Sequence, residues 1–230
     1  LKRSFRVSFF NVSFSFIDKE IDVTLIVSAM IGQYSVLAAD RKQSNFFTTL
    51  IGKSFLRDTT KIRLINGIAF TGGGRVFILD KIKAEFTAII KKDPEELLLD
   101  DKLKYFNNIS DFNGLNFVVA LPLKDKKYLH KFYLQGKESY YNYFEHSNDI
   151  LDLNKFNIMA LPPADVSFDD VLKYCIELFK NSEDMSKETI LLKMRTIFKY
   201  YSSVSKFVSS DFDIVFQNHD DESIIINVPN

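Results

Sequence analysis

Short apolar runs separated by turn residues dominate the first part of the sequence. Two pairs of such runs predict two β-hairpins: residues 24–29 with 34–39 around Gly32-Gln33, and residues 61–65 with 68–71 around Asn66-Gly67. An Asn-Gly step between apolar runs is a strong short-range hairpin signal. The pattern therefore predicts antiparallel strands over most of residues 24–71.

Helical periodicity follows in two places. Gly72-Gly73-Gly74 opens a predicted helix, and a second helical stretch follows Pro94. Residues 168–180 and 187–200 form a second predicted pair, with Ser167 as the N-cap of its first member. In the predicted helix after Gly72-Gly73-Gly74, apolar residues recur every three or four positions, at Val76, Leu79, Ile82 and Phe86.

Strand-like segments fill the rest of the chain. They cover residues 115–121, 129–135 and 139–144 in the middle and residues 213–217 and 223–228 near the end. The order is strands, two helices, strands, two helices, strands, without an internal repeat or a linker rich in Pro, Gly or Ser. Antiparallel hairpins that flank paired helices indicate an α+β fold with two sheets between helical layers. One domain over residues 24–230 is the simplest organisation.

Residues 1–23 do not follow this pattern. Their start, LKRSFRVSFFNVSFSF, lacks the unbroken apolar stretch and the small-residue cleavage site of a signal peptide. Three interpretations stay open: a propeptide, an added edge strand, or a segment that is not translated. In the third, Lys19-Glu20 is encoded by a ribosome-binding sequence and Val23 is a GTG start codon read as Met. Removal of that Met would leave Thr24 as the amino terminus.

Composition narrows the range of functions. Lys plus Arg and Asp plus Glu each total 30, so the net charge is zero, which argues against a dedicated nucleic-acid binder. The sequence has no apolar run long enough to span a membrane. The three histidines have no metal-ligand spacing, so we expect no metal site. The one cysteine, Cys175, lies on the apolar face of a predicted helix, which favours a buried structural thiol and fits a reducing compartment.

Residues 24–40 read TLIVSAMIGQYSVLAAD, and TTKIRLINGIAFTGGG follows at residues 59–74. With the order of elements, these stretches resemble the proteasome β-subunits and the bacterial peptidase HslV. The resemblance is sharp over residues 24–74 and holds in outline over the rest of the chain. It implies the four-layer αββα sandwich of the N-terminal-nucleophile (Ntn) hydrolases. It places Thr24 at the catalytic threonine, Asp40 at the aspartate, Lys61 at the lysine and Gly72 at the loop glycine.

The resemblance also implies the chemistry. A threonine hydroxyl needs a base, and in this class the base is the threonine's own α-amino group, with an ordinary pKa of about 7.7–8.0. Lys61 would disfavour a second positive charge and so lower the amine pKa, while Asp40 holds Lys61 in place. The N–H of Gly72 would donate to the oxyanion. Peptide bonds would then be hydrolysed through an ester on Thr24, without a metal or cofactor.

The same resemblance assigns four further residues. Ser209 is the candidate for a supporting serine, with an ordinary loop serine as the alternative. Arg63, Phe70 and Gly74 would lie near the pocket for the residue before the cut bond. Taken singly, each site residue also has a plain structural interpretation, since a threonine that opens a strand is usually only a strand residue.

The sequence departs from the family pattern in three places. Pro162-Pro163 stands where active members have a Gly/Ser-rich turn, and Ser205 or Lys206 stands where an Asp is expected. Val23 replaces the glycine that precedes the threonine in self-processing members. If residues 1–23 are kept, autocatalytic release of Thr24 is not expected.

Two functions of different classes follow. The first is a cytoplasmic threonine peptidase of the proteasome/HslV kind, assembled as a homo-oligomeric ring that acts on peptides or on unfolded proteins delivered by an ATP-dependent unfoldase. The second is a non-catalytic subunit of the same fold that serves assembly or binding. A free amine on Thr24 would distinguish the first from the second. Neither function involves nucleic acid or a membrane.

Overall fold

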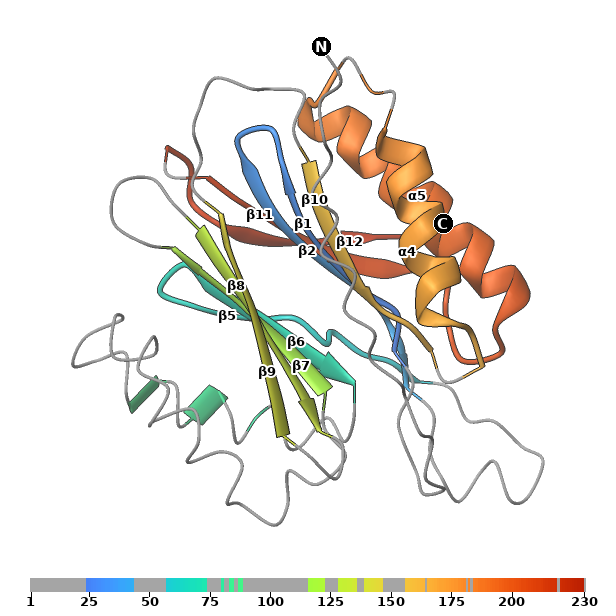
Figure 1. The fold of residues 1–230 in the computed structure, drawn as a ribbon. Helices are drawn as coiled ribbons and strands as arrows, with labels where there is room; N and C mark the ends of the chain where they lie inside the picture. Colours follow the sequence, from blue (N-terminus) through green and yellow to red (C-terminus); the bar gives the residue numbers. More distant parts are fainter. Residues whose placement is uncertain are drawn as a thin grey trace.

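The computed structural model describes residues 24–43, 57–73, 80, 83–84, 87–88, 116–122, 128–135, 139–146, 156–163, 165–180, 182, 184–218 and 220–229. These residues form two five-stranded antiparallel sheets and two long helices (Figure 1). A short ladder of β3 (Lys42–Gln43) and β4 (Arg57–Asp58) stands apart from both sheets.

The first sheet has the strand order β10-β1-β2-β11-β12. Its strands are β10 (Phe156–Leu161), β1 (Ile26–Ile31), β2 (Tyr34–Asp40), β11 (Phe212–Gln217) and β12 (Ile224–Val228). The second sheet has the order β5-β6-β7-β8-β9. Its strands are β5 (Arg63–Ile65), β6 (Ile68–Gly73), β7 (Asn116–Pro122), β8 (Tyr128–Gln135) and β9 (Ser139–His146).

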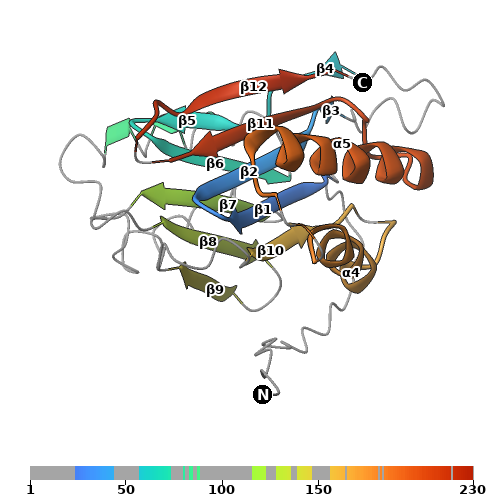
Figure 2. The same ribbon diagram turned by 90° about the horizontal axis from the view of Figure 1, so that it is seen from above.

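The two helices, α4 (Phe168–Phe179) and α5 (Lys187–Val204), cover the face of the first sheet that points away from the second (Figure 1). Seen from above, they again lie together on one side of the sheets (Figure 2). Side chains of a strand alternate between two faces, and β1 shows it: Val27 and Ala29 pack toward the helices, whereas Ile26 packs between the sheets. The first sheet is therefore covered on both faces.

Both predicted hairpins are confirmed. β1 and β2 are joined at Gly32-Gln33, and β5 and β6 at Asn66-Gly67. Asn66 has a φ of 48° and Gly67 a φ of 80°, which is the conformation a tight two-residue hairpin turn needs. The Asn-Gly step was thus a sound guide to the start of the second sheet.

Three local expectations differ from the structure. Gly72 and Gly73 end strand β6 and do not form a loop. Ser167 is the N-cap residue of α4, but its side chain makes no capping hydrogen bond. Strand β10 has no counterpart in the sequence prediction, because its run FNIMAL lacks polar alternation, and its pairing with β1 defines it.

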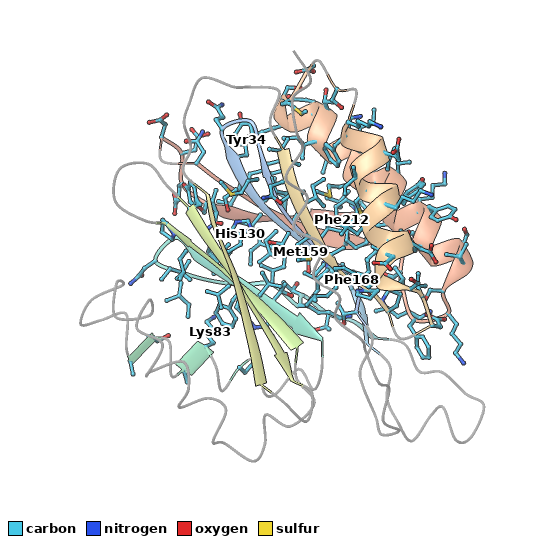
Figure 3. All side chains as sticks on the ribbon, in the orientation of Figure 1. Tyr34, Lys83, His130, Met159, Phe168 and Phe212 are labelled. Carbon is cyan, nitrogen blue, oxygen red and sulfur yellow. The ribbon has the colours of Figure 1, made fainter. Side chains whose placement is uncertain are left out.

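The fourth layer remains a prediction. Residues 80, 83–84 and 87–88 are helical, and Lys83 lies on the side of the second sheet away from α4 and α5 (Figure 3). The stretch after Pro94 lies outside the described residues. The structure thus shows an α+β fold with two antiparallel sheets and one helical layer, and the four-layer sandwich goes beyond it.

A line of neutral polar side chains connects the two sheets. Ser28 and Ser35 of the first sheet lie 2.7 Å from the Nδ1 and Nε2 atoms of His130, respectively. His130 comes from β8 of the second sheet and is labelled in Figure 3. Ser35 donates to Oε1 of Gln217 (2.6 Å), whose Nε2 donates to the carbonyl oxygens of Gly67 (2.5 Å) and Ala120 (3.2 Å). We call Ser28, Ser35, His130 and Gln217 the His130 cluster.

Candidate active site

The first hairpin brings the start of β1 against the end of β2. Ile26 is the partner of Ala39 in the β1–β2 ladder, and the pairing extends one residue further. The N–H of Leu25 donates to Oδ1 of Asp40 (3.1 Å), and the N–H of Asp40 donates to the carbonyl oxygen of Leu25 (3.2 Å). The antiparallel register therefore places Thr24 beside Asp40.

Lys61 completes a charged cluster with these two residues. Its Nζ lies 2.7 Å from Oγ1 of Thr24 and 3.2 Å from Oδ1 of Asp40. The exposed fractions of Thr24, Lys61 and Asp40 are 5%, 4% and 0%. Lys61 precedes β5, and its neighbour Ile62 is buried in the core between the sheets. We call Thr24, Asp40 and Lys61 the Thr24 cluster.

Asp40 is held entirely by nitrogen donors. Besides Leu25 and Lys61 at Oδ1, its Oδ2 accepts from the N–H of Lys42 (2.9 Å) and from the N–H of Ser209 (3.4 Å). Complete burial raises the pKa of Asp40 above its ordinary value, and the positive charge of Lys61 is the largest effect that opposes this rise. A carboxylate among N–H donors accepts from all of them only when ionised, so the contacts favour an Asp40–Lys61 ion pair.

Ser209 joins the site through Asp40. Its backbone N–H is the donor to Asp40, whereas its hydroxyl donates to the carbonyl oxygen of Asp211 (2.5 Å) and accepts from the N–H of Arg41 (3.3 Å). These contacts fix the loop before β11 against the end of β2. The assignment of Ser209 as a supporting serine stays a prediction.

The other predicted residues lie on or near β5 and β6. Gly72 pairs with Phe117 of β7, and its role as an oxyanion donor is untested. Arg63 and Phe70 face each other across the β5–β6 ladder. Phe70 is fully buried, and Nε of Arg63 donates to Asp80 (2.9 Å). Gly74 lies outside the described residues, so the predicted pocket stays a prediction.

The residues that depart from the family pattern make hydrogen bonds outside the Thr24 cluster. Ser205, where an Asp was expected, donates to Oδ1 of Asp165 (2.6 Å) and so ties the end of α5 to the loop before α4. The neighbouring carbonyl of Lys206 accepts from Nζ of Lys42. Pro163 is buried, and its carbonyl accepts from the N–H of Val166 (3.1 Å).

The sequence analysis missed a second ion pair beside this cluster. Nη1 of Arg41 donates to Oδ1 of Asp213 (2.9 Å), which also accepts from Nδ2 of Asn227 (3.2 Å). Asp213 is 1% exposed. A usable signal was present, because Asp213 stands inside the apolar strand FDIVFQ, and a charged residue at a buried strand position is rarely left unpaired.

Three further candidate features can be described within the residues that the structure covers. No group of three or more His, Cys, Asp or Glu side chains there gathers in a way that could hold a metal. No helix among them is long and apolar enough to cross a membrane. Cys175 is buried as expected, and burial raises the pKa of its thiol to about 12, so it is a poor nucleophile.

Nucleophilic attack by Thr24 would need an activated hydroxyl and a base, and the contacts can supply only the first. A lysine ammonium can only donate, so the Thr24 oxygen accepts from Lys61 and its own proton is available to a base. The positive charge also stabilises an alkoxide that forms there. In a chain that keeps residue 23, however, the nitrogen of Thr24 belongs to a peptide bond with Val23 and cannot accept a proton.

Comparison with known proteins rests on structure. No family model matches the chain, and no curated protein matches it. A solved structure of the Gly-1 mutant of Anbu from Hyphomicrobium sp. strain MC1 matches with a TM-score of 0.57 and 14% identity, over 90% of this chain and 89% of that chain. The likeness shows the fold.

The comparison also corrects one expectation. The sequence resemblance pointed to the proteasome β-subunit and HslV family, and that assignment is wrong. The solved structure found to be similar is Anbu, which is related to HslV and the proteasome but is a distinct family, and no family model places this chain with them. Four residues that match in type and order, Thr24, Asp40, Lys61 and Gly72, could not separate one family from a related one.

Proposed function

We propose that the protein is an Ntn hydrolase that cleaves peptide bonds through an acyl ester on Thr24. One observation carries the proposal: Nζ of Lys61 lies 2.7 Å from the Thr24 hydroxyl oxygen and 3.2 Å from Asp40. A buried lysine is rarely placed on a threonine hydroxyl for stability alone, because burying an ammonium costs free energy unless it is fully paired. The proteasome-like fold supports the same chemistry by analogy.

The reaction would proceed in two steps once the Thr24 nitrogen is a free amine. In the first, the hydroxyl oxygen attacks the peptide carbonyl carbon and its proton passes to the amine. The resulting oxyanion accepts from the N–H of Gly72, and its collapse expels the leaving amine, which takes the proton back. In the second step a water molecule gives a proton to the Thr24 amine and attacks the ester carbon. The Thr24 oxygen then leaves and takes this proton back, which releases the acid and restores Thr24.

A non-catalytic member of the fold is the second candidate. The observation that favours it is Val23, since the peptide bond between Val23 and Thr24 removes the base. The Thr24 cluster would then be a structural ion pair with a hydroxyl partner. The two candidates differ in one covalent fact, namely whether the Thr24 nitrogen is an amine.

The proposal includes a cytoplasmic homo-oligomeric ring that accepts peptides or unfolded protein from an ATP-dependent unfoldase, and the four-layer αββα arrangement. Apolar side chains on the outer surface support association. Leu192 and Val204 on α5 and Ile224 on the edge strand β12 are more than half exposed, and association would remove them from water. Mass photometry of the purified chain would measure the number of copies.

The test compares two forms of the chain with fluorogenic peptides and a covalent acylating probe. One form begins at Thr24 after removal of an initiator Met, and the other keeps residues 1–23. We expect turnover and a single probe adduct on Thr24 in the first form only. Thr24→Ala should abolish both, whereas Thr24→Ser, which keeps a hydroxyl, should retain part of the activity. A Thr24-initiated chain that folds, yet neither turns over peptides nor reacts with the probe, would support the non-catalytic candidate.

A further inference from the structure

Asp213 lies at the junction of the segments that carry the Thr24 cluster. In the first sheet it is the partner of Ala39 in β2 on one side and of Asn227 in β12 on the other. Its neighbour Val215 belongs to the core between the sheets. Because side chains two apart share a face of a strand, the carboxylate of Asp213 points toward the second sheet, from which Lys61 comes.

The side chain of Asp213 lies against two segments: the one that continues from Asp40 and the one that carries Lys61. Its Oδ1 accepts from Arg41, the residue directly after Asp40, and from Asn227. Burial raises the pKa of the Asp213 carboxyl, and the charge of Arg41, the Lys61 N–H and the Thr60 hydroxyl oppose this rise. Neither the Lys61 N–H nor the Thr60 hydroxyl completes a hydrogen bond of ordinary geometry with Oδ2, which has no such partner among the described residues.

The two segments are also joined by their backbones. The N–H of Thr59 donates to the carbonyl oxygen of Arg41 (3.0 Å), and the hydroxyl of Thr71 donates to the carbonyl oxygen of Lys61 (3.2 Å). Asp213 therefore adds a buried charge to a junction whose backbones already touch. Burying a carboxylate costs free energy that its partners only partly offset, so a role beyond stability would explain its position.

We propose that Asp213 is a positioning residue, which binds Arg41 and faces the Thr60–Lys61 backbone so that Asp40 and Lys61 are held in register with Thr24. This inference rests on the proposed function, since positioning matters only if Thr24 reacts. Asp213 does not touch Thr24 and acts through the segments on either side of it. A shift of about 1 Å at a reacting centre can lower the rate by about 100-fold, so a small relaxation at this junction would be measurable.

Asp213→Asn tests the proposal with the least change in shape. Its amide oxygen can still accept from Arg41 and Asn227, but its NH₂ group would face the two donors on Thr60 and Lys61. We expect kcat to fall by about 10- to 100-fold with KM unchanged, and a crystal structure should show a longer separation between Lys61 Nζ and Thr24 Oγ1. Gln217→Met, which alters another buried polar residue of β11, should change neither.

Two results would overturn the inference: an Asp213→Asn variant with the parent kcat, or one with the parent separation between Lys61 and Thr24. If Asp213→Asn does not fold, Arg41→Gln removes the ion pair from the other end, and the same two measurements apply to it. The separation between Lys61 Nζ and Thr24 Oγ1 can be measured whether or not the protein is active. An inactive parent chain would therefore count against the proposed function alone, whereas an unchanged separation would count against the positioning role alone.

Discussion

Two buried polar clusters flank the core between the sheets and differ in kind. Along β1, β2 and β11 the positions that face the second sheet run from polar through apolar to polar: Thr24–Ile26–Ser28, Arg41–Ala39–Leu37–Ser35 and Asp213–Val215–Gln217. Thr24, Arg41 and Asp213 lie at one end of these rows, beside Asp40 and Lys61, and Ser28, Ser35 and Gln217 lie at the other, beside His130. The first end carries the ion pairs of Asp40 and Asp213, whereas the second is built from Ser, His and Gln side chains.

The proton positions of the His130 cluster follow from its contacts. Gln217 must present its NH₂ group to the two carbonyl oxygens, so its Oε1 accepts from Ser35. A serine hydroxyl has one proton, so Ser35 must accept from Nε2–H of His130. In the neutral tautomer with its proton on Nε2, the Nδ1 atom would accept from Ser28.

The Thr24 cluster differs from the His130 cluster. Lys61 donates to both of its partners and accepts from neither, which leaves the Thr24 proton available. The difference teaches that burial and hydrogen bonding alone do not indicate a reactive site. A buried ion pair whose cation also donates to a hydroxyl is the more telling feature.

The largest effect should come from breaking the charged cluster with Lys61→Met. It leaves the carboxylate of Asp40 buried without its ion-pair partner, and we expect the free energy of unfolding to fall by about 3–5 kcal/mol, with loss of turnover. Chemical denaturation measures the first and peptide hydrolysis the second. Lys187→Met is the matched control, because its ion pair with Asp221 is exposed and such pairs contribute about 0–1 kcal/mol. Equal losses in the two variants would contradict the idea that the buried Asp40–Lys61 pair matters more than an exposed ion pair.

Breaking the neutral cluster should have a smaller effect of another kind. Gln217→Met keeps the approximate shape but leaves two carbonyl oxygens and the Ser35 hydroxyl without this partner. We expect a loss of about 1–3 kcal/mol in unfolding free energy, with the activity per folded molecule unchanged. Asn218→Ala, at the adjacent, less buried position, should stay within about 0.5 kcal/mol of the parent. A fall in kcat in Gln217→Met would show that the two ends of the layer are coupled.

The two clusters also differ in how far the sequence predicts them. The Gly32 and Asn66-Gly67 turns are local, so the hairpins and the approach of Thr24 to Asp40 could be predicted. Lys61 could be placed only through a resemblance to known enzymes, because nothing local says that its side chain is buried. The resemblance pointed to the wrong family, and the catalytic roles that it implies for these residues stay predictions.

The remaining contacts join residues far apart in the chain. Ser35 and Gln217 are separated by 182 positions, Arg41 and Asp213 by 172, and Ser35 and His130 by 95. Serine, histidine and glutamine in strand-like runs have many other uses, so their types do not announce a cluster. Strand β10 was missed for a related reason, since its partner β1 lies at the other end of the chain. Long-range pairing, which single-residue patterns do not encode, decides these features.

Lowering the pH should reduce the activity of the Thr24 cluster while the protein stays folded, and it should change the unfolding free energy least of the three tests. Burial raises the pKa of Asp40 above its ordinary value of 3.8, so the folded state binds this proton more tightly than the unfolded state. As the pH falls through the native pKa, Asp40 therefore stabilises the fold, and this contribution is lost as the pH rises again.

The protonated carboxyl no longer pairs with Lys61, so kcat/KM should fall on the acid side at a pH above 3.8 while the circular dichroism signal is kept. Relative to Asp40→Asn, the parent should gain unfolding free energy as the pH is lowered from 7 toward 4. If activity and the folded signal disappeared together, or if the parent lost stability relative to Asp40→Asn, the ion pair of the Thr24 cluster would be mainly structural, and the charged cluster would resemble the His130 cluster more than their chemistry suggests.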